Sequence, residues 1–364
     1  MINNPKVLHI ITNLDQGGAE RQLLELVNKK HEVCQLLSEG YYDKQLFQKN
    51  IKVYSLNMKR KIPNILVLYK LYKVINISKP DIIHCWMYHS SLLESCLRMI
   101  TRKKSIPLVW GIRCSNMDTK YYSLQLKIII KLCSFFSALP NLIINNSYAG
   151  KDVHDKLGFN KSSIVISNGV DTKKFSPNKI HKDEFRKKFK ISEDAKVLLC
   201  VARVDPMKDH VTLLEAFKKI RSINSKVILI LAGLGTKKFK HEDNVIALGS
   251  CENIHKVYAA SDIIISSSAF GEGFSNAISE GMSSGLIPIS TAVGDANIII
   301  NNTGRIVPVK NEIVLFEAIR DIINLKDNDW EILKNQARNR IINNYSKEIM
   351  IDNYKHIYSS ILET

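Results

Sequence analysis

Short, almost continuous apolar runs alternate with longer amphipathic stretches along the whole chain of 364 residues. Most of these runs are built of Val, Ile and Leu and lack the polar alternation of a half-exposed strand. Such runs indicate strands of parallel sheets that helices cover on both faces. The predicted strands are residues 7–12, 32–37, 52–56, 81–85, 107–111, 142–145, 163–166, 196–201, 226–232, 245–248, 263–266, 287–290 and 304–308.

This alternation predicts an α/β protein with two doubly wound domains, because 364 residues exceed one ordinary hydrophobic core. We place the first domain at residues 1–170 and the second at 171–345. The last helix, residues 346–364, is expected to fold back onto the first domain. The polar, basic stretch 171–190 is the predicted linker.

The cysteines argue against a disulfide-rich or zinc-binding protein. All seven are scattered and form no C-x-x-C, which indicates buried thiols in a reducing compartment. No uncharged apolar run approaches the roughly 18 residues of a spanning helix, and the apolar run near the N-terminus is too short for a signal peptide. We therefore expect a cytoplasmic protein.

The net charge is +17, and residues 1–165 carry +13 of it against +4 for the remainder. Nucleic acid is one partner for such a charge, but the chain has no recognition motif for it, so we expect none. Residues 58–74 and 120–136 interleave lysines with Leu, Ile and Tyr, which is typical of basic helices on an anionic membrane surface. Core helices with lysines on the wet face are the alternative. The lysines and arginine concerned are Lys59, Arg60 and Lys61, and Lys120, Lys127 and Lys131.

The segment AFGEGFSNAISEGMSSGLIPIS carries two carboxylates, Glu272 and Glu280, separated by seven residues. The first is expected in a glycine-flanked loop after a buried strand, and the second about two turns into the next helix. Backbone N–H groups of the loop and the helix N-terminus would then hold a phosphate, with a carboxylate on each side for sugar hydroxyls. Two unrelated surface glutamates are the alternative, but the flanking strand, helix and strand form a unit of a parallel sheet.

Two cations follow the predicted strand 196–201. Arg203 comes directly after it and Lys208 five residues later. Ligands of open α/β sheets bind beyond the C-terminal strand ends, so this pair would face the Glu272 loop and clamp a diphosphate. The alternative is that both residues are solvated surface charges. This alternative fits Lys208 better than Arg203, which directly follows a buried strand.

A further motif, LDQGGAERQLLEL, places Gly17 and Gly18 at a strand-to-helix turn. Glycines there let a ligand approach backbone N–H groups at a helix start, although a tight turn alone needs the same residues.

Taken in order, the segments GGAER, ISNGVDTKKFSP, CVARVDPMKDH, AGLG and GEGFSNAISEGMSSGLIPIS resemble family 4 of the retaining GT-B glycosyltransferases. The resemblance covers nearly the whole chain, and its last motif is the most specific. It implies two Rossmann-like domains facing a central cleft, with the acceptor on the first and the nucleotide-sugar donor on the second. Such enzymes commonly build lipopolysaccharide, capsule or glycoprotein glycans in bacteria.

The resemblance also implies roles for single residues. Arg203 and Lys208 would hold the donor diphosphate and stabilise the leaving nucleotide, Glu272 would hold donor-sugar hydroxyls, and Glu280 the ribose. No metal or other cofactor is expected, because cations and helix dipoles neutralise the leaving group and no D-x-D pair follows an apolar strand. The other implied donor-binding residues are Gly17, Gly18, Gly273, Phe274, Ser275 and Asn276.

One position departs from the family pattern. Many members carry a histidine after the strand that corresponds to residues 107–111, and here Arg113 stands near that place. An arginine does not act as a base, so Arg113 would bind a phosphate or the acceptor instead. His84 and His89 would line the acceptor side. A histidine near a strand end is more often structural, and retaining transfer in this fold needs no dedicated base, since the donor phosphate can take the acceptor proton.

The sequence therefore predicts a retaining hexosyl- or N-acetylhexosaminyltransferase with a nucleotide-sugar donor, UDP-linked in our interpretation. Its acceptor would be lipid-linked or a polysaccharide, at the inner face of the plasma membrane. A nucleotide-sugar epimerase of similar fold is one alternative, and a non-catalytic protein that binds nucleotide sugars or anionic polymers is another. The motifs specify neither the donor base and sugar nor the acceptor, the linkage or the oligomeric state.

Overall fold

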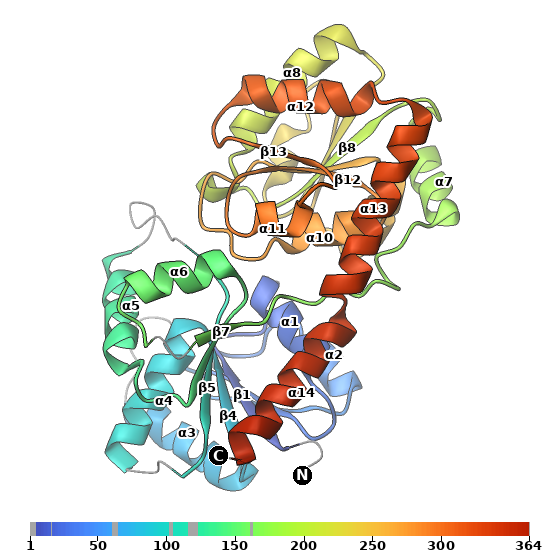
Figure 1. Ribbon diagram of the computed structural model, residues 1–364. Coiled ribbons are helices and arrows are strands. Elements are labelled where there is room, and N and C mark those ends of the chain that lie inside the picture. Colours follow the sequence, from blue (N-terminus) through green and yellow to red (C-terminus); the bar gives the residue numbers. More distant parts are fainter. Residues whose placement is uncertain are drawn as a thin grey trace. The chain divides into compact units, whose positions relative to one another are not determined.

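The computed structural model describes residues 5–15, 17–59, 65–101, 105–115, 123–160 and 163–363. The chain forms two compact units: unit 1 comprises Met1–Gly169 and Lys347–Thr364, and unit 2 comprises Val170–Ser346. Each unit contains one parallel sheet with helices on both of its faces (Figure 1). The predicted class, α/β with two doubly wound sheets, is confirmed.

Unit 1 is built on a seven-stranded sheet with the order β3-β2-β1-β4-β5-β6-β7. β1, β4 and β5 are buried at every position, because helices cover both faces, and this explains their mostly apolar sequences, which only His9 and His84 interrupt. The strands are β1 (Val7–Ile11), β2 (Glu32–Gln35), β3 (Lys52–Ser55), β4 (Ile82–Trp86), β5 (Leu108–Ile112), β6 (Leu142–Asn145) and β7 (Ser163–Val165).

The helices of unit 1 form two layers. Apolar residues of α3, α4 and α5 pack on one face of the sheet, and those of α1, α2 and α14 pack on the other. The last helix, α14, comes after the whole of unit 2 in the sequence, and yet Tyr354 and Tyr358 are among the most buried residues of unit 1. The helices are α1 (Gly18–Leu26), α2 (Asp43–Gln48), α3 (Ile65–Ser78), α4 (Met87–Thr101), α5 (Leu124–Phe136), α6 (Tyr148–Lys156) and α14 (Lys347–Glu363).

Unit 2 is built on a six-stranded sheet with the order β10-β9-β8-β11-β12-β13. Helices α8 and α12 cover one face, and α9, α10, α11 and most of α13 cover the other. The strands are β8 (Val197–Val201), β9 (Ile228–Ala232), β10 (Val245–Gly249), β11 (Ile263–Ser266), β12 (Ile287–Thr291) and β13 (Arg305–Val307). The helices are α7 (Lys179–Lys188), α8 (His210–Ile223), α9 (Ile254–Ala260), α10 (Asn276–Ser283), α11 (Ala296–Ile300), α12 (Glu312–Ile323) and α13 (Asp327–Tyr345), with short 3₁₀ turns η1 (Pro206–Lys208) and η2 (Thr236–Phe239).

Every predicted strand is observed, with ends that differ by at most two residues. The predicted linker, 171–190, is wrong, because it contains α7. The Asn178 side chain caps this helix by accepting from the His181 N–H, and Arg186 is buried against the start of β11 through an ion pair with Asp262 of 2.9 Å. The stretch looked like a linker because charged residues dominate it.

In the described part of the chain, no helix combines the length and apolarity that a membrane crossing requires.

Candidate active site

The four charged residues predicted for donor binding all lie in unit 2. β8 ends at Val201, just before Arg203, and β11 ends at Ser266, just before the loop that carries Glu272. β8 and β11 are parallel neighbours in the sheet, so both segments leave it at the same C-terminal edge. This is the edge at which open α/β sheets bind ligands.

Lys208 and Glu272 form an ion pair at this edge between Nζ and Oε1, and both side chains are largely buried. The hydroxyl of Ser268 donates to the same Oε1 at 2.7 Å. Burial by itself raises the pKa of the Glu272 carboxyl, but the Lys208 charge and the two hydrogen bonds outweigh it, so the pKa is lowered. Glu272 is therefore a fixed carboxylate at neutral pH.

The backbone around Lys208 is held on both sides. The Asp205 side chain caps η1 by accepting from the Met207 N–H at 2.9 Å, and Asp209 caps α8 by accepting from the Thr212 N–H. Asp209 adopts a left-handed conformation with φ 43°, which turns the chain sharply between η1 and α8. The Ser267 hydroxyl donates to the Lys208 carbonyl at 2.9 Å, so the segment after β11 fixes the position of the lysine.

Arg203 is more exposed, with 54% of its side chain accessible, and it pairs with Asp205 at 3.1 Å. Neither ion pair was predicted, although Lys208 was expected to face the Glu272 loop. A signal for Asp205 was present, because Asp followed by Pro marks the start of a helical turn. Both cations are thus engaged by carboxylates.

The loop after Glu272 leads into α10. Ser275 is the N-cap of α10, so Glu280 is the fifth residue of the helix. Glu280 therefore lies little more than one turn from the helix start, and the prediction that it lies about two turns into the helix is wrong. Glu280 is only 3% exposed.

The loop that carries Glu272 is supported by residues 294 and 295. The Asp295 N–H donates to the Gly273 carbonyl at 3.0 Å. A Cβ at Gly294 would lie 2.4 Å from the Glu272 carbonyl oxygen. Gly294 is therefore required by the loop, and sequence reasoning missed it.

In unit 1, Gly17 is the N-cap of α1 and Gly18 its first residue. A Cβ at Gly17 would lie 2.1 Å from the Glu20 carboxylate, so the flexible Glu20 side chain would have to move if a larger residue stood there. Burial raises the pKa of Glu20. The two glycines thus occupy the predicted strand-to-helix turn, and their role toward a donor stays a prediction.

His84 and Arg113 both contact α14. His84 is inside β4, is fully buried, and contacts the Tyr358 hydroxyl of α14 at 2.8 Å through Nδ1. Arg113 donates to Asn168 and to the Tyr354 hydroxyl, and its guanidinium lies 4.4 Å from the Trp86 ring. Both residues attach α14 to the sheet of unit 1, and their place on the acceptor side stays a prediction.

His89 differs from these two residues. It is exposed in the first turn of α4, directly beyond the C-terminal end of β4, so it stays a candidate for the acceptor side. Among the described residues, no three His, Cys, Asp or Glu side chains are grouped so as to hold a metal ion.

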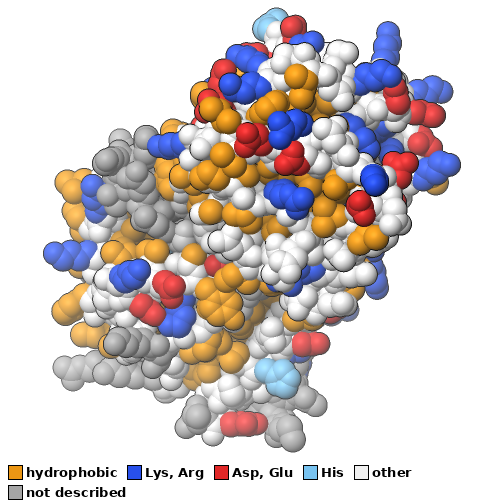
Figure 2. Space-filling model, turned by 45° about the horizontal axis from the view of Figure 1, so that its top comes forward, with side chains coloured by type: hydrophobic (Ala, Val, Ile, Leu, Met, Phe, Trp, Pro, Cys, Tyr) orange, Lys and Arg blue, Asp and Glu red, His pale blue; other side chains and the backbone are white. Residues whose placement is uncertain are grey.

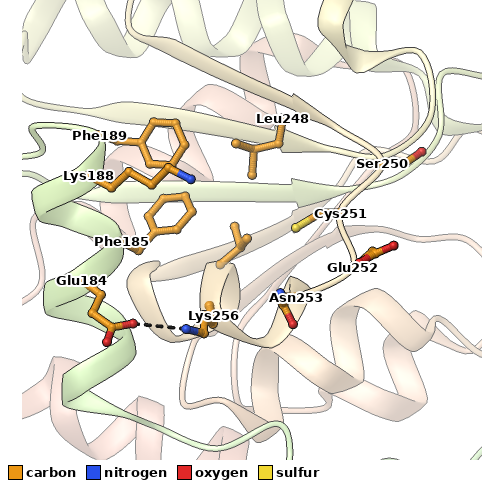
Figure 3. A pocket seen from close by; sticks show the side chains of 11 residues that line it. Glu184, Phe185, Lys188, Phe189, Leu248, Ser250, Cys251, Glu252, Asn253 and Lys256 are labelled. Carbon is orange, nitrogen blue, oxygen red and sulfur yellow. Dashed lines mark hydrogen bonds and ion pairs between the residues drawn. The ribbon is translucent and has the colours of Figure 1, made fainter.

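A cavity of about 470 Å³ lies in unit 2 between α7, α9 and the end of β10 (Figure 3). Its interior is apolar, with Phe185 from α7, Phe189 directly after α7, and Leu248 from β10. An ion pair of 3.1 Å between Lys256 and Glu184 crosses one side. None of the residues that were predicted to bind the donor lines it.

Two doubly wound units, with cations and carboxylates at the C-terminal edge of the second sheet, define the class of GT-B glycosyltransferases. Anabaena HepE in complex with UDP is similar, with a TM-score of 0.83, 19% identity, and coverage of 98% of this chain and 100% of that chain. A glycosyltransferase from Rickettsia africae ESF-5 has a TM-score of 0.80 and 21% identity over 100% of both chains.

Two family models match successive parts of the sequence: "Glycosyltransferase Family 4" matches residues 16–174, and "Glycosyl transferases group 1" matches residues 181–345. The chain belongs to the glycosyltransferases of the GT-B family 4 type.

Named relatives are similar over most of their length. The UDP-Gal:alpha-D-GlcNAc-diphosphoundecaprenol alpha-1,3-galactosyltransferase of Escherichia coli is 26% identical over 80% of this chain and 78% of its own. The N-acetylgalactosamine-N,N'-diacetylbacillosaminyl-diphospho-undecaprenol 4-alpha-N-acetylgalactosaminyltransferase of Campylobacter jejuni is 22% identical over 91% of this chain and 93% of its own.

Proposed function

We propose that this glycosyltransferase moves a hexosyl or N-acetylhexosaminyl group, with retention of anomeric configuration, from a nucleotide sugar to a lipid-linked or polysaccharide acceptor in bacterial surface glycan synthesis. The observation that carries the proposal is the buried pair of Lys208 and Glu272 beside Arg203, at the sheet edge from which α10 starts. Cations for a diphosphate and a fixed carboxylate for sugar hydroxyls are thus next to each other.

In this proposal the donor diphosphate lies between Arg203, Lys208 and the N–H groups of residues 273–276 at the start of α10. Negative charge grows on the diphosphate as the glycosidic bond breaks, so cations that are already in position stabilise the transition state more than the ground state. Glu272 holds hydroxyls of the transferred sugar and Glu280 those of the ribose. The departing phosphate oxygen takes the acceptor proton, and no metal is required for this step.

UDP is the proposed nucleotide. The name of the Escherichia coli relative specifies a UDP-linked sugar, and Anabaena HepE has been solved with UDP and with UDP-glucose. By their names, the Escherichia coli and Campylobacter jejuni relatives act on diphosphoundecaprenol-linked sugars, which supports a lipid-linked acceptor. The excess charge of residues 1–165 supports a peripheral location at an anionic membrane surface, on the inner face of the plasma membrane.

The test is transfer from a panel of UDP-sugars to a diphosphoundecaprenol-linked acceptor, with the anomeric configuration of the product read by NMR. Glu272→Gln should abolish most of the turnover, whereas Glu215→Gln, in an exposed pair with Lys218, should not.

Excess EDTA tests whether transfer needs a metal ion, and the rate of transfer should survive it. An inverted product, a requirement for added divalent metal, or full activity of Glu272→Gln would each contradict the corresponding part of the proposal.

A further inference from the structure

Helix α5 of unit 1 is apolar on both of its faces. Ile130 and Cys133 are buried in the core beneath it, as expected for a helix that covers a sheet. The opposite face carries large apolar side chains in solvent, where a surface helix normally has polar residues. They are Leu124, Ile128, Leu132 and Phe135, which are 71%, 52%, 41% and 79% exposed.

These four residues form one stripe. Their spacing of four, four and three residues returns each to nearly the same side of a helix with about 3.6 residues per turn. Lys127 and Lys131 are exposed on the same side, and α5 contains no acidic residue. Single exposed apolar residues are common on any surface, but a continuous stripe of this length is not.

The neighbouring helices extend this surface. α5 packs against α4, and α4 packs against α3. α3 exposes Tyr69 and Ile77 with Lys70 and Lys73 on one side, and α4 exposes Met99 and Ile100 at its end. Hydrophobic side chains lie beside lysines and arginines along the left side of unit 1 in the space-filling view (Figure 2). Of the lysines and arginine noted in the sequence, Arg60, Lys61 and Lys120 lie outside the described residues.

We propose that the outer face of α5 is the surface by which the enzyme inserts into an anionic lipid bilayer. An in-plane helix buries its apolar stripe at the level of the acyl chains while its lysines reach out to the headgroup phosphates. The lysines and the absence of acidic residues on α5 match a negative surface and would repel a basic one. The inference rests on the proposed function in so far as a lipid-linked acceptor brings the enzyme to a membrane.

The first experiment measures co-sedimentation with vesicles of equal parts phosphatidylglycerol and phosphatidylcholine at physiological salt. Leu124→Gln, Ile128→Gln and Phe135→Gln combined should weaken binding about tenfold or more, because the apolar insertion is lost. The matched control replaces Ile180, Val211 and Ile223 of unit 2 by Gln, since these are 70%, 69% and 60% exposed, and should bind as the wild type does. Lys127→Glu with Lys131→Glu should also weaken binding, with the larger loss at low salt.

A second experiment reads insertion directly. The three tryptophans, Trp86, Trp110 and Trp330, are all buried, so Phe135→Trp adds a single exposed indole. Its fluorescence should shift to the blue with anionic vesicles and should be quenched by brominated acyl chains. No shift, or binding of the α5 triple variant equal to that of the control, overturns the proposal.

Two further outcomes separate the inference from its alternatives. If the wild type is a dimer without lipid and the α5 triple variant is a monomer, the stripe is an interface between copies of the chain and the proposal fails. Under this proposal, α5 contributes neither to UDP binding nor to transfer to a detergent-solubilised acceptor. Retention of both activities in the triple variant, together with loss of vesicle binding, supports the inference. Unchanged vesicle binding with intact transfer refutes the inference and leaves the proposed function standing.

Discussion

Each predicted cation of unit 2 already has a carboxylate partner: Lys208 contacts Glu272, and Arg203 contacts Asp205. In the proposed function, an incoming diphosphate therefore competes with carboxylates that the protein itself supplies. The two pairs differ in this respect, because the first is buried and reinforced by Ser268, whereas the second is exposed. The exposed pair is the one that an anion can open at low cost.

Asp205→Asn should therefore bind UDP more tightly. An asparagine keeps the side-chain oxygen that caps η1, while Arg203 loses a competing charge. An exposed ion pair contributes about 0.2–1 kcal/mol, so we expect a gain of up to about fivefold in calorimetry. Asp194→Asn, in an exposed pair with Lys226, is the control. Unchanged or weaker UDP binding would mean that Asp205 does not compete with the ligand.

Arg203→Ala should lower kcat far more than it weakens donor binding, because the charge that it faces grows toward the transition state. Removal of one preorganised donor costs about 3–4 kcal/mol in comparable sites, or about 10² to 10³ in kcat. Steady-state kinetics with UDP-sugar and calorimetry with UDP separate the two effects. A raised KM with normal kcat would restrict Arg203 to ground-state binding.

At the scale of single elements, the strands were predictable and the contacts at their ends were not. The apolar runs gave every strand, because burial on both faces requires them. His84 shows the limit of this argument. All five residues of β4 are buried, so the strand has no alternation of polar and apolar residues that would show which element covers the histidine. The covering element is α14, which lies far away in the sequence. The pair of Lys208 and Glu272 was missed for the same reason, since it joins two separate loops.

The elements β1, β4 and α14 meet at a buried cluster of imidazoles, which predicts an acid-sensitive unit 1. His9 Nε2 lies 3.0 Å from His31 Nδ1. Burial lowers the pKa of His31 to about 4, and burial and the neighbouring imidazoles lower that of His9; burial and the Arg113 charge lower that of His84. Unfolded histidines titrate near pH 6.5, so the unfolded chain binds protons that the folded unit does not.

The free energy of unfolding should therefore be greatest above about pH 6.5 and should fall as the pH drops toward 4, by at most about 1.4 kcal/mol per pH unit for each histidine. Urea unfolding at pH 7 and at pH 5 measures this. His31→Gln should reduce the difference between the two pH values. An equal difference in the variant would assign the acid sensitivity to other groups.

At the scale of the whole molecule, the two units differ in how their residues are distributed along the sequence. Unit 2 is one continuous segment, Val170–Ser346, and contains both of its apolar cores and all four charged residues of the candidate site. A fragment of residues 170–346 should therefore fold and retain UDP binding, as seen by calorimetry. A fragment that unfolds, or that folds without affinity for UDP, would show that unit 1 is required for the site.

Unit 1, in contrast, depends on α14, because Met350, Tyr354 and Tyr358 fill one side of its core and hold His84 and Arg113. A ribosome produces residues 1–169 first, but it supplies these three side chains only after the whole of unit 2 has been made. Domains usually complete their folding in the order in which they are made. Here the order is reversed: the second unit can complete its folding before α14 is made, while one hydrophobic face of the first unit is still uncovered. A chain that stops before α14 should thus contain a finished second unit and an unfinished first one, which the cell meets as a substrate for chaperones and proteases.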